Sequence, residues 1–216
     1  MTRVVLVHGT RDDASGFEAV VDLLDDLDVV TYTRRGWGDE PGDAAPLDVH
    51  AGDLVDVLDE QPSVVVGHSF GGNVAVRALL RRPDLVRALG VWETTMLWHP
   101  EWPSLTADAL RATIERVRAK VDGTPRQQRH RALFVAEGEI ALTDAHDLDA
   151  VAALAVPTVV AIGEHSLPFF GEGTEAIAHH LGATYDVVDA CGHLAHREAP
   201  EAFAAFVRDV AALAPG

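Results

Sequence analysis

A serine stands between two glycines in the segment Gly67-His68-Ser69-Phe70-Gly71. The apolar run Ser63 to Val66 precedes this segment, and a helical pattern from Asn73 to Leu80 follows it. A serine at such a strand-to-helix corner forms a nucleophile elbow, in which a strained turn lifts the hydroxyl clear of the backbone. A structural serine in a tight turn is the alternative. Because both flanks are of the required type, the sequence predicts that Ser69 is a nucleophile.

A serine hydroxyl needs a base within hydrogen-bond reach, and that base needs a third group to orient it. His193 is the candidate base, because it follows the last strand pattern in the segment Ala190-Cys191-Gly192-His193. His196 is the rival, although its position favours the start of the final helix. His68 lies inside the elbow, where we expect it to point away from the nucleophile and to pack or hydrogen-bond locally.

The pair His8-Gly9 follows the apolar run Val4 to Val7 and precedes Thr10. A tetrahedral intermediate needs two hydrogen-bond donors aimed at its oxyanion. We expect the backbone amides of Thr10 and Phe70 to supply them. An ordinary strand-ending turn is the alternative for His8-Gly9. Its coincidence with an elbow and a late Gly-His pair favours a site for acyl transfer.

Six short strand patterns alternate with helical patterns along the chain. The predicted strands cover residues 4–7, 29–32, 64–66, 87–92, 157–162 and 184–188. The predicted helices of this alternation cover residues 14–27, with Asp13 or Ser15 as the cap, 48–60, 73–80 and 198–213. This alternation implies parallel pairing and right-handed crossovers, so we expect an α/β fold with a doubly wound, mostly parallel sheet. Ligands bind such sheets at the carboxyl ends of the strands.

The stretch from residue 95 to 156 shows helical patterns, the clearest from Ala107 to Val121, and no strand pattern. We interpret it as a short helical cap insertion, so that residues 1–94 and 157–216 form the core. Trp98 and Trp102 lie near the start of this insertion and are candidate substrate-binding residues. Packing of the cap onto the core is the alternative role for these indoles.

The chain is strongly acidic, with 216 residues and a formal net charge of −17. Such a field repels phosphate backbones and anionic membrane surfaces, so we expect a small-molecule substrate and neither nucleic acid nor membrane as partner. The single cysteine, Cys191, excludes an internal disulfide. No signal peptide or membrane span is readable, so we expect a cytoplasmic protein. The oligomeric state is not readable.

Motifs for cofactors or metals are weak in this chain. Neither a phosphate loop nor a dinucleotide fingerprint is present, so we expect no cofactor. His179-His180 and the pair His193 and His196 are accompanied by no cluster of cysteines or carboxylates, so we expect no metal.

The elbow, the His8-Gly9 pair and the late Gly192-His193 pair, in this order, resemble the α/β-hydrolase superfamily from Val4 to Leu213. The segment from Tyr32 to Asp39 is similar to a family loop of the form Arg-Gly-x-Gly-x-Ser, with an aspartate where many members continue toward serine. The resemblance implies an α/β-hydrolase fold that begins at the strand usually numbered third and lacks the N-terminal hairpin.

The chain departs from this family at the acid that orients the histidine. Most members place it in a Gly-x-x-Asp pattern after the penultimate strand, where this chain has Gly163-Glu164-His165-Ser166. Some members place the acid after the strand that follows the nucleophile helix, and Glu93 stands there. The resemblance therefore implies Glu93 as the acid, with Glu164 as the second choice. A solvated strand-end residue is the alternative for Glu93.

The resemblance implies a serine hydrolase with Ser69, His193 and Glu93 as its catalytic residues. Its expected substrate is a small, partly apolar molecule with an ester-type bond, which includes carboxylic esters, lactones and thioesters. The same fold hosts carbon–carbon bond hydrolysis and acyl transfer, and these remain open. The replaced acid also leaves open a hydrolase-like protein that binds a small molecule without turning it over.

Overall fold

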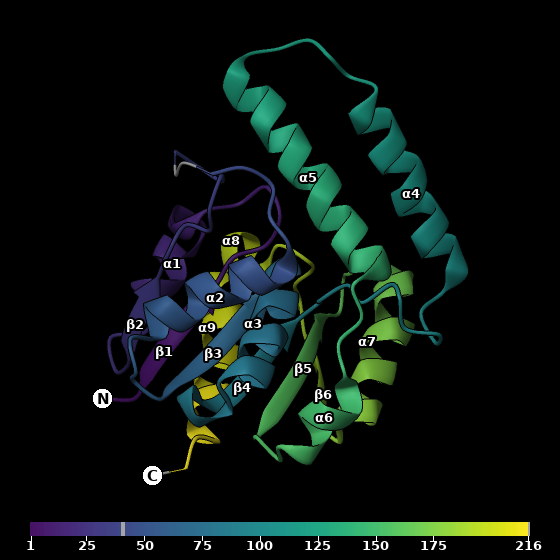
Figure 1. The fold of residues 1–216 in the computed structure, drawn as a ribbon. Coiled ribbons are helices and arrows are strands. Elements are labelled where there is room, and N and C mark those ends of the chain that lie inside the picture. The colour runs from purple at the N-terminus through teal and green to yellow at the C-terminus, as the bar shows by residue number, and fades with distance from the viewer. Residues whose placement is uncertain (40–41, 216) are drawn as a thin grey trace.

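The computed structural model describes residues 1–39 and 42–215, and within them one six-stranded sheet lies between two layers of helices (Figure 1). Its strands are β1 (Arg3–Val7), β2 (Asp28–Thr31), β3 (Ser63–His68), β4 (Val86–Trp92), β5 (Thr158–Gly163) and β6 (Thr184–Val188). Every neighbouring pair is parallel, in the order β2-β1-β3-β4-β5-β6. The predicted doubly wound α/β fold is confirmed.

Valine-rich sequences form the central strands because both faces of this sheet are covered. The side chains of Val4 to Val7 and of Val64 to Val66 are almost completely buried. The chain runs from β1 outward to β2 and then returns across β1 to β3. The carboxyl ends of β1 and β3 therefore meet at the point where the winding reverses, which is where such sheets bind ligands.

Two apolar clusters join the helices to the sheet. One cluster contains side chains from α2 (Leu47–Leu58), α3 (Phe70–Arg81), α6 (Leu148–Ala153) and α7 (Pro168–Leu181). The other contains side chains from α1 (Glu18–Val21) and α9 (Pro200–Ala212) on the opposite face. Three short helices complete these layers: η1 (Ala14–Phe17), η2 (Pro83–Leu85) and α8 (Ala195–Glu198). None of the helices in the described parts of the chain is long and apolar enough to cross a bilayer.

Helices α4 (Ser104–Arg118) and α5 (Pro125–Thr143) form a hairpin that projects from the layered part of the molecule (Figure 1). The Thr124 side chain begins α5 with a capping box, in which Thr124 and Gln127 each bind the other's backbone amide. The whole described stretch between β4 and β5 contains helices and no strand. Its division into core and cap remains an interpretation of this arrangement.

Asn73 on α3 ties both ends of the inserted helices to the core. Its side-chain amide donates to the Thr95 carbonyl at 3.1 Å, and its carbonyl oxygen accepts from His146 Nε2 at 3.0 Å. Arg77, one turn further along α3, pairs with Asp144 at 2.6 Å. Burial, assisted by Arg77, lowers the pKa of His146 to about 3. His146 is therefore a neutral hydrogen-bond donor at the base of the hairpin.

The helix predicted from Ala14 to Leu27 is shorter than expected. It is a turn of 3₁₀-helix followed by the single turn α1, which ends at Val21. Beyond it, the amides of Leu23, Leu24 and Leu27 each bind the carbonyl three residues earlier, so tight turns replace the helix. Of the two predicted caps, Asp13 is the one used, because its side chain accepts the Ser15 amide.

The buried His146 predicts an acid-sensitive fold. An unfolded chain protonates this histidine below its ordinary pKa of 6.5, whereas the folded chain keeps it neutral down to about 3. The unfolded state thus binds more protons in this window, so the free energy of unfolding falls as the pH drops from 6.5 to 3. We expect His146→Gln to reduce this slope by up to about 1.4 kcal/mol per pH unit.

Urea denaturation of the parent and of His146→Gln at a series of pH values measures this slope. His179→Gln, at an exposed position on α7, is the matched control and keeps the parent slope. An unchanged slope in His146→Gln would contradict the assignment of a neutral, buried imidazole.

Candidate active site

Ser69 lies at the corner between β3 and α3, where the sequence predicts an elbow. Its φ of 54° and ψ of −125° are costly for a residue with a side chain. Two contacts hold this conformation. The Ser69 amide donates to the Trp92 carbonyl at 2.8 Å, and the Thr94 hydroxyl donates to the Ser69 carbonyl at 2.9 Å. The end of β4 and the loop after it therefore fix the strained turn, and Ser69 lines a cavity.

The predicted oxyanion residues lie at the same cavity. A Cβ placed on Gly9 would come within 2.8 Å of the Ser69 Cβ, so the His8-Gly9 turn can lie this close to Ser69 only with glycine at this position. Thr10 and Phe70 both line the cavity that Ser69 lines. Phe70 is the first residue of α3, so no helical carbonyl is available to its amide.

His193 and Glu93 form a hydrogen-bonded pair. His193 Nδ1 lies 2.8 Å from Glu93 Oε2, and the Glu93 carboxylate is completely buried whereas His193 is about one-third exposed. An imidazole that donates from Nδ1 to a carboxylate keeps a lone pair on Nε2. The His193 ring also stacks on Phe170, with centroids 5.1 Å apart and planes inclined by 13°. His193 lines the same cavity as Ser69.

Ser166 occupies the place where the family pattern predicts an acid, and it binds Glu93. Its hydroxyl donates to Glu93 Oε1, and the Gly163 amide donates to the same oxygen at 2.8 Å. Glu164, the second candidate for the acid, is half-exposed and accepts the Ala190 amide at 3.0 Å instead. The structure thus brings Glu93, and not Glu164, to His193.

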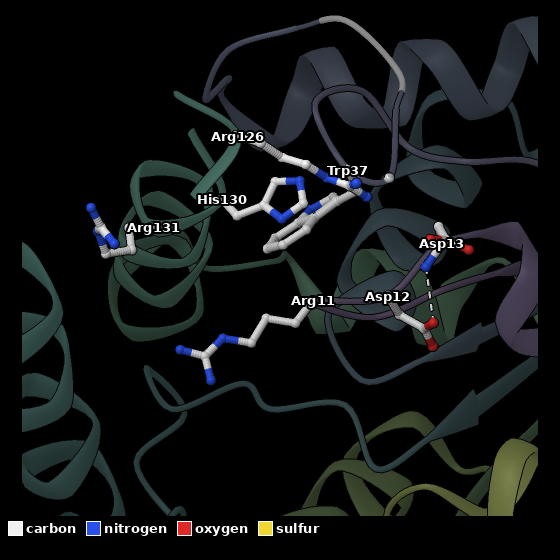
Figure 2. Close-up of a pocket in the computed structure, with 8 residues that line it drawn as sticks. Arg11, Asp12, Asp13, Trp37, Arg126, His130 and Arg131 are labelled. Carbon is white, nitrogen blue, oxygen red and sulfur yellow. Dashed lines mark hydrogen bonds between the residues drawn. The ribbon is translucent and has the colours of Figure 1, made fainter. Parts of the chain in front are cut away.

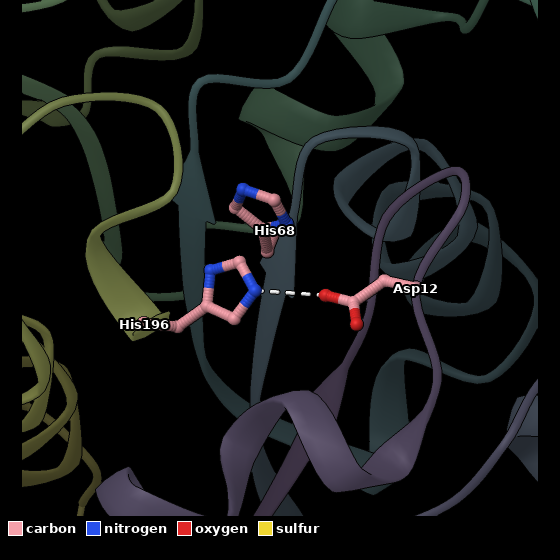
Figure 3. A group of neighbouring side chains, drawn as sticks. All are labelled: Asp12, His68 and His196. Carbon is pink, nitrogen blue, oxygen red and sulfur yellow. Dashed lines mark hydrogen bonds and ion pairs between the residues drawn. The ribbon is translucent and has the colours of Figure 1, made fainter. Parts of the chain in front are cut away.

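Behind His193 lies a buried trio, Asp12, His68 and His196 (Figure 3). His196 belongs to α8 and binds Asp12 Oδ2 at 2.7 Å, so the rival base is engaged away from the cavity. His68 Nε2 lies 2.8 Å from the His193 carbonyl. Burial lowers the pKa of His68 well below its ordinary value, so His68 is neutral and donates to that carbonyl.

The same trio offers ligand atoms within 4.8 Å of one another, which suits a metal ion in spacing. Its carboxylate is already engaged by His196, the Arg197 guanidinium and the Asp13 amide. Burial raises the pKa of Asp12, but these hydrogen bonds outweigh it and hold the pKa below its usual range. A metal there would stand beside the Arg197 cation. These contacts favour a structural role for the trio.

A buried ion pair joins α5 to the turn that carries Thr10. Arg34, in the loop after β2, binds Glu137 on α5 at 2.7 Å, and both side chains are at most 2% exposed. The Arg34 guanidinium also donates to the carbonyls of His8 and Gly9, each at 2.9 Å. The Glu137 carboxylate further accepts the Thr10 hydroxyl at 2.5 Å and the Trp37 indole at 2.7 Å.

Charge and proton positions in this network are well defined. Burial raises the pKa of Glu137, but Arg34 and the hydrogen-bond donors lower it overall, so the carboxylate is ionised. Burial, assisted by Arg34, lowers the pKa of His8 to about 3. His8 Nε2 accepts the Arg34 amide at 2.9 Å, so the proton of the neutral ring is on Nδ1. Local sequence patterns did not indicate Glu137, because its partner Arg34 is 103 residues away.

The cavity above Ser69 has a volume of about 810 Å³ and lies between the sheet and the hairpin. Besides Ser69 and His193, its walls are largely apolar and include Leu97, Leu110, Phe134, Ala141, Pro168 and Phe170. Leu110 comes from α4 and Phe134 from α5, so the inserted helices supply much of the wall.

Trp98 and Trp102, the predicted substrate-binding residues, do not line this cavity. Trp102 is buried and packs against Gly173 on α7, which leaves no room for a side chain at that glycine. The Trp98 ring packs against His99 and His146. Both indoles thus fasten the start of the insertion to neighbouring segments, as in the packing alternative, and the expectation of substrate contact gains no support.

The chain belongs to the Alpha/beta hydrolase family, whose profile matches residues 4–206. It is similar to Lipase LipV of Mycobacterium tuberculosis, with 37% identity over 92 residues, which are 40% of this chain and 35% of that protein. It is also similar to 2-(acetamidomethylene)succinate hydrolase of Mesorhizobium japonicum, with 29% identity over 122 residues, or 54% and 41% of the two chains. The matches therefore span less than half the length of these curated relatives.

Solved structures show the same fold. A thermophilic esterase from Thermogutta terrifontis superimposes with a TM-score of 0.77 at 23% identity, covering 97% of this chain and 89% of that chain. The site residues described above are therefore carried on an α/β-hydrolase fold.

The Arg34–Glu137 pair predicts a large stability effect. Arg34→Met leaves a buried carboxylate without its cation, so we expect the free energy of unfolding to fall by about 3–5 kcal/mol. Arg34→Met combined with Glu137→Leu removes both charges and should cost clearly less than the single change. Urea denaturation measures all three proteins.

The control is Arg111→Gln, which breaks an exposed pair with Asp108 on α4 and should leave the denaturation midpoint unchanged. Equal losses of unfolding free energy in the single and the double variant would contradict this explanation. They would show that the loss in Arg34→Met does not come from an unpaired buried carboxylate.

Proposed function

We propose that this chain is a serine hydrolase that cleaves an ester-type bond of a small, partly apolar molecule through an acyl-enzyme. The observation that carries the proposal is the hydrogen bond between His193 and the buried Glu93, beside a strained Ser69 that borders the same cavity. A nucleophile, a base and an orienting carboxylate in this arrangement are the components of acyl transfer by a serine.

In the proposed reaction, the Ser69 hydroxyl attacks the substrate carbonyl carbon while His193 Nε2 takes its proton. The resulting oxyanion is held by the amides of Thr10 and Phe70. His193 then protonates the leaving alcohol or thiol, and the carbonyl re-forms as a Ser69 acyl ester. Water, deprotonated by His193, attacks this ester, and the bond to Ser69 breaks as His193 returns the proton to the Ser69 oxygen and the acid is released. Throughout, Glu93 keeps the His193 proton on Nδ1 and stabilises the imidazolium.

The substrate class follows from the cavity. A mostly apolar cavity of about 810 Å³ suits an acyl or alcohol portion of several carbons. Carboxylic esters, lactones and thioesters share the carbonyl chemistry of the proposed site. Carbon–carbon bond hydrolysis and acyl transfer use the same groups, but no contact among the described residues of the cavity favours either over hydrolysis of an ester-type bond. We also retain a cytoplasmic location as part of the proposal, since Cys191 is buried and unpaired.

A protein that binds a small molecule without turnover is the second hypothesis, which the serine at position 166 suggested. The contacts of that serine argue against it, because Ser166 binds Glu93 and Glu93 binds His193. In this proposal, the carboxylate that orients His193 belongs to Glu93, directly after β4, and position 166 does not need an acid.

A fluorophosphonate probe tests the nucleophile directly. We expect the parent protein to be labelled at Ser69 and Ser69→Ala to remain unlabelled, because only an activated serine attacks the probe under native conditions. Mass spectrometry of the labelled peptide locates the adduct. A native parent that stays unlabelled would favour the binding protein over the hydrolase.

The acid is tested by Glu93→Gln, which keeps the shape of the side chain and removes the charge. We expect kcat/KM for p-nitrophenyl butyrate to fall by about 100-fold to 10,000-fold, because the glutamine no longer stabilises the imidazolium. Glu164→Gln is the matched control and should stay within a few-fold of the parent. The reverse result would place the acid at Glu164. Thermal unfolding of both variants checks that the fold is retained.

A further inference from the structure

A second cavity of about 440 Å³ lies between the start of α5 and the loops after β1 and β2 (Figure 2). It is lined by Arg11, Asp12, Asp13, Trp37, Gly38, Arg126, His130 and Arg131. Arg11 is also part of the wall of the apolar cavity above Ser69. This side chain therefore stands where the two cavities meet.

Three arginines, Arg11, Arg126 and Arg131, line this cavity in a chain whose net charge is −17, and Arg126 pairs with Asp39 at 3.4 Å. Arg126, His130 and Arg131 come from the first two turns of α5, and Arg11 faces them from the loop after β1 (Figure 2). His130 packs its ring on Trp37 at 5.2 Å, and its Nε2 is buried without a hydrogen-bond partner among the described residues. A buried polar atom of this kind is costly unless a ligand or water satisfies it.

Arg11 is held in an unusual conformation. Its φ of 64° lies in the left-handed region, which a residue with a side chain seldom adopts. The guanidinium carbon lies 4.2 Å from the centre of the Phe134 ring, a cation–π contact that holds the group beside α5. No ion pair or hydrogen bond joins this exposed guanidinium to another of the described residues. Its donors are therefore available to a ligand.

The acidic residues of the second cavity do not neutralise Arg11. Asp12 is engaged by His196 and Arg197, and Asp13 accepts the Ser15 amide and hydroxyl. Figure 2 shows the Arg11 side chain extending away from both carboxylates. The exposed Glu172 lines the apolar cavity but not the second one. A negative group on a ligand is therefore favoured beside Arg11 over a position beside Glu172.

We infer that Arg11 binds a carboxylate carried by the substrate, so that the preferred substrate is an ester or thioester with a carboxylate on its apolar chain. This inference rests on the proposed function and narrows its substrate class. The apolar chain lies in the cavity above Ser69, and the carboxylate lies at the junction with the second cavity. A guanidinium fork matches a carboxylate with two parallel hydrogen bonds.

A single carboxylate fits better than a phosphate dianion. One unpaired guanidinium balances one negative charge, whereas a dianion would carry excess charge toward Asp12 and Asp13. The overall negative field also disfavours a doubly charged substrate more than a singly charged one.

Two esters with acyl chains of six carbons test the inference. One is p-nitrophenyl hexanoate, and the other is the mono-p-nitrophenyl ester of adipic acid, in which a carboxylate replaces the terminal methyl group. We expect the factor by which Arg11→Gln raises KM to be about ten times larger for the adipate ester than for the hexanoate ester. Arg11→Lys keeps the charge without the fork and should lie between Arg11→Gln and the parent. Arg111→Gln removes an exposed charge from α4, outside both cavities, and controls for long-range electrostatics.

Binding is measured separately, so that a failure of catalysis does not obscure the result. Calorimetry on Ser69→Ala should show about tenfold tighter binding of monomethyl adipate than on Ser69→Ala combined with Arg11→Gln. Methyl hexanoate should bind both alike. Equal adipate binding by the two proteins, or equal rises in KM for both esters, would overturn the inference. If neither ester is hydrolysed but the binding difference is present, the proposed function fails and the carboxylate site stands.

Discussion

Three elements of the fold meet at the buried carboxylate of Glu93. It stands directly after β4, receives the Gly163 amide and the Ser166 hydroxyl from the end of β5, and binds His193 from the loop after β6. A buried charge is stable only when its oxygens are hydrogen-bonded, so these donors are a condition for placing a carboxylate there. Glu93 itself has a φ of 43°, and its amide is held by the Ala161 carbonyl at 2.9 Å. The sheet therefore fixes both the backbone and the side chain of this residue.

The same strand end also fixes Ser69. The Trp92 carbonyl accepts the Ser69 amide, and the Thr94 hydroxyl binds the Ser69 carbonyl. Trp92 and Thr94 thus hold the strained backbone of Ser69, and Glu93 between them binds His193. Because both contacts depend on one short segment, the relative positions of Ser69 and His193 are coupled through the end of β4 and the two residues that follow it.

The sequence alone indicated the parts of this arrangement that depend on local pattern. Valine-rich runs predicted the strands, and the glycines around Ser69 predicted the elbow, because both features follow from backbone geometry and burial within a few residues. The contact of Glu93 with His193 was implied by the family resemblance, but other contacts between distant segments were not readable. Ser166 looked like the loss of an acid, although its hydroxyl binds the Glu93 carboxylate. The indole of Trp102 predicted substrate contact, but it packs on Gly173, and sequence hydrophobicity does not distinguish these two roles.

Two buried carboxylates organise the site, one directly after a strand of the sheet and one on the insertion. Glu93 orders groups that the sheet itself supplies, whereas Glu137 comes from α5 and binds Arg34 and Thr10. Through Arg34, the hairpin contacts the carbonyls of His8 and Gly9, so the insertion is joined to the turn beside Ser69 by buried, charge-assisted hydrogen bonds. The walls contributed by α4 and α5 are mostly apolar, and none of their described residues makes a hydrogen bond to Ser69 or His193. Changes in these walls can therefore alter which molecule fits the cavity without displacing Ser69, provided that Glu137 keeps its contact with Arg34.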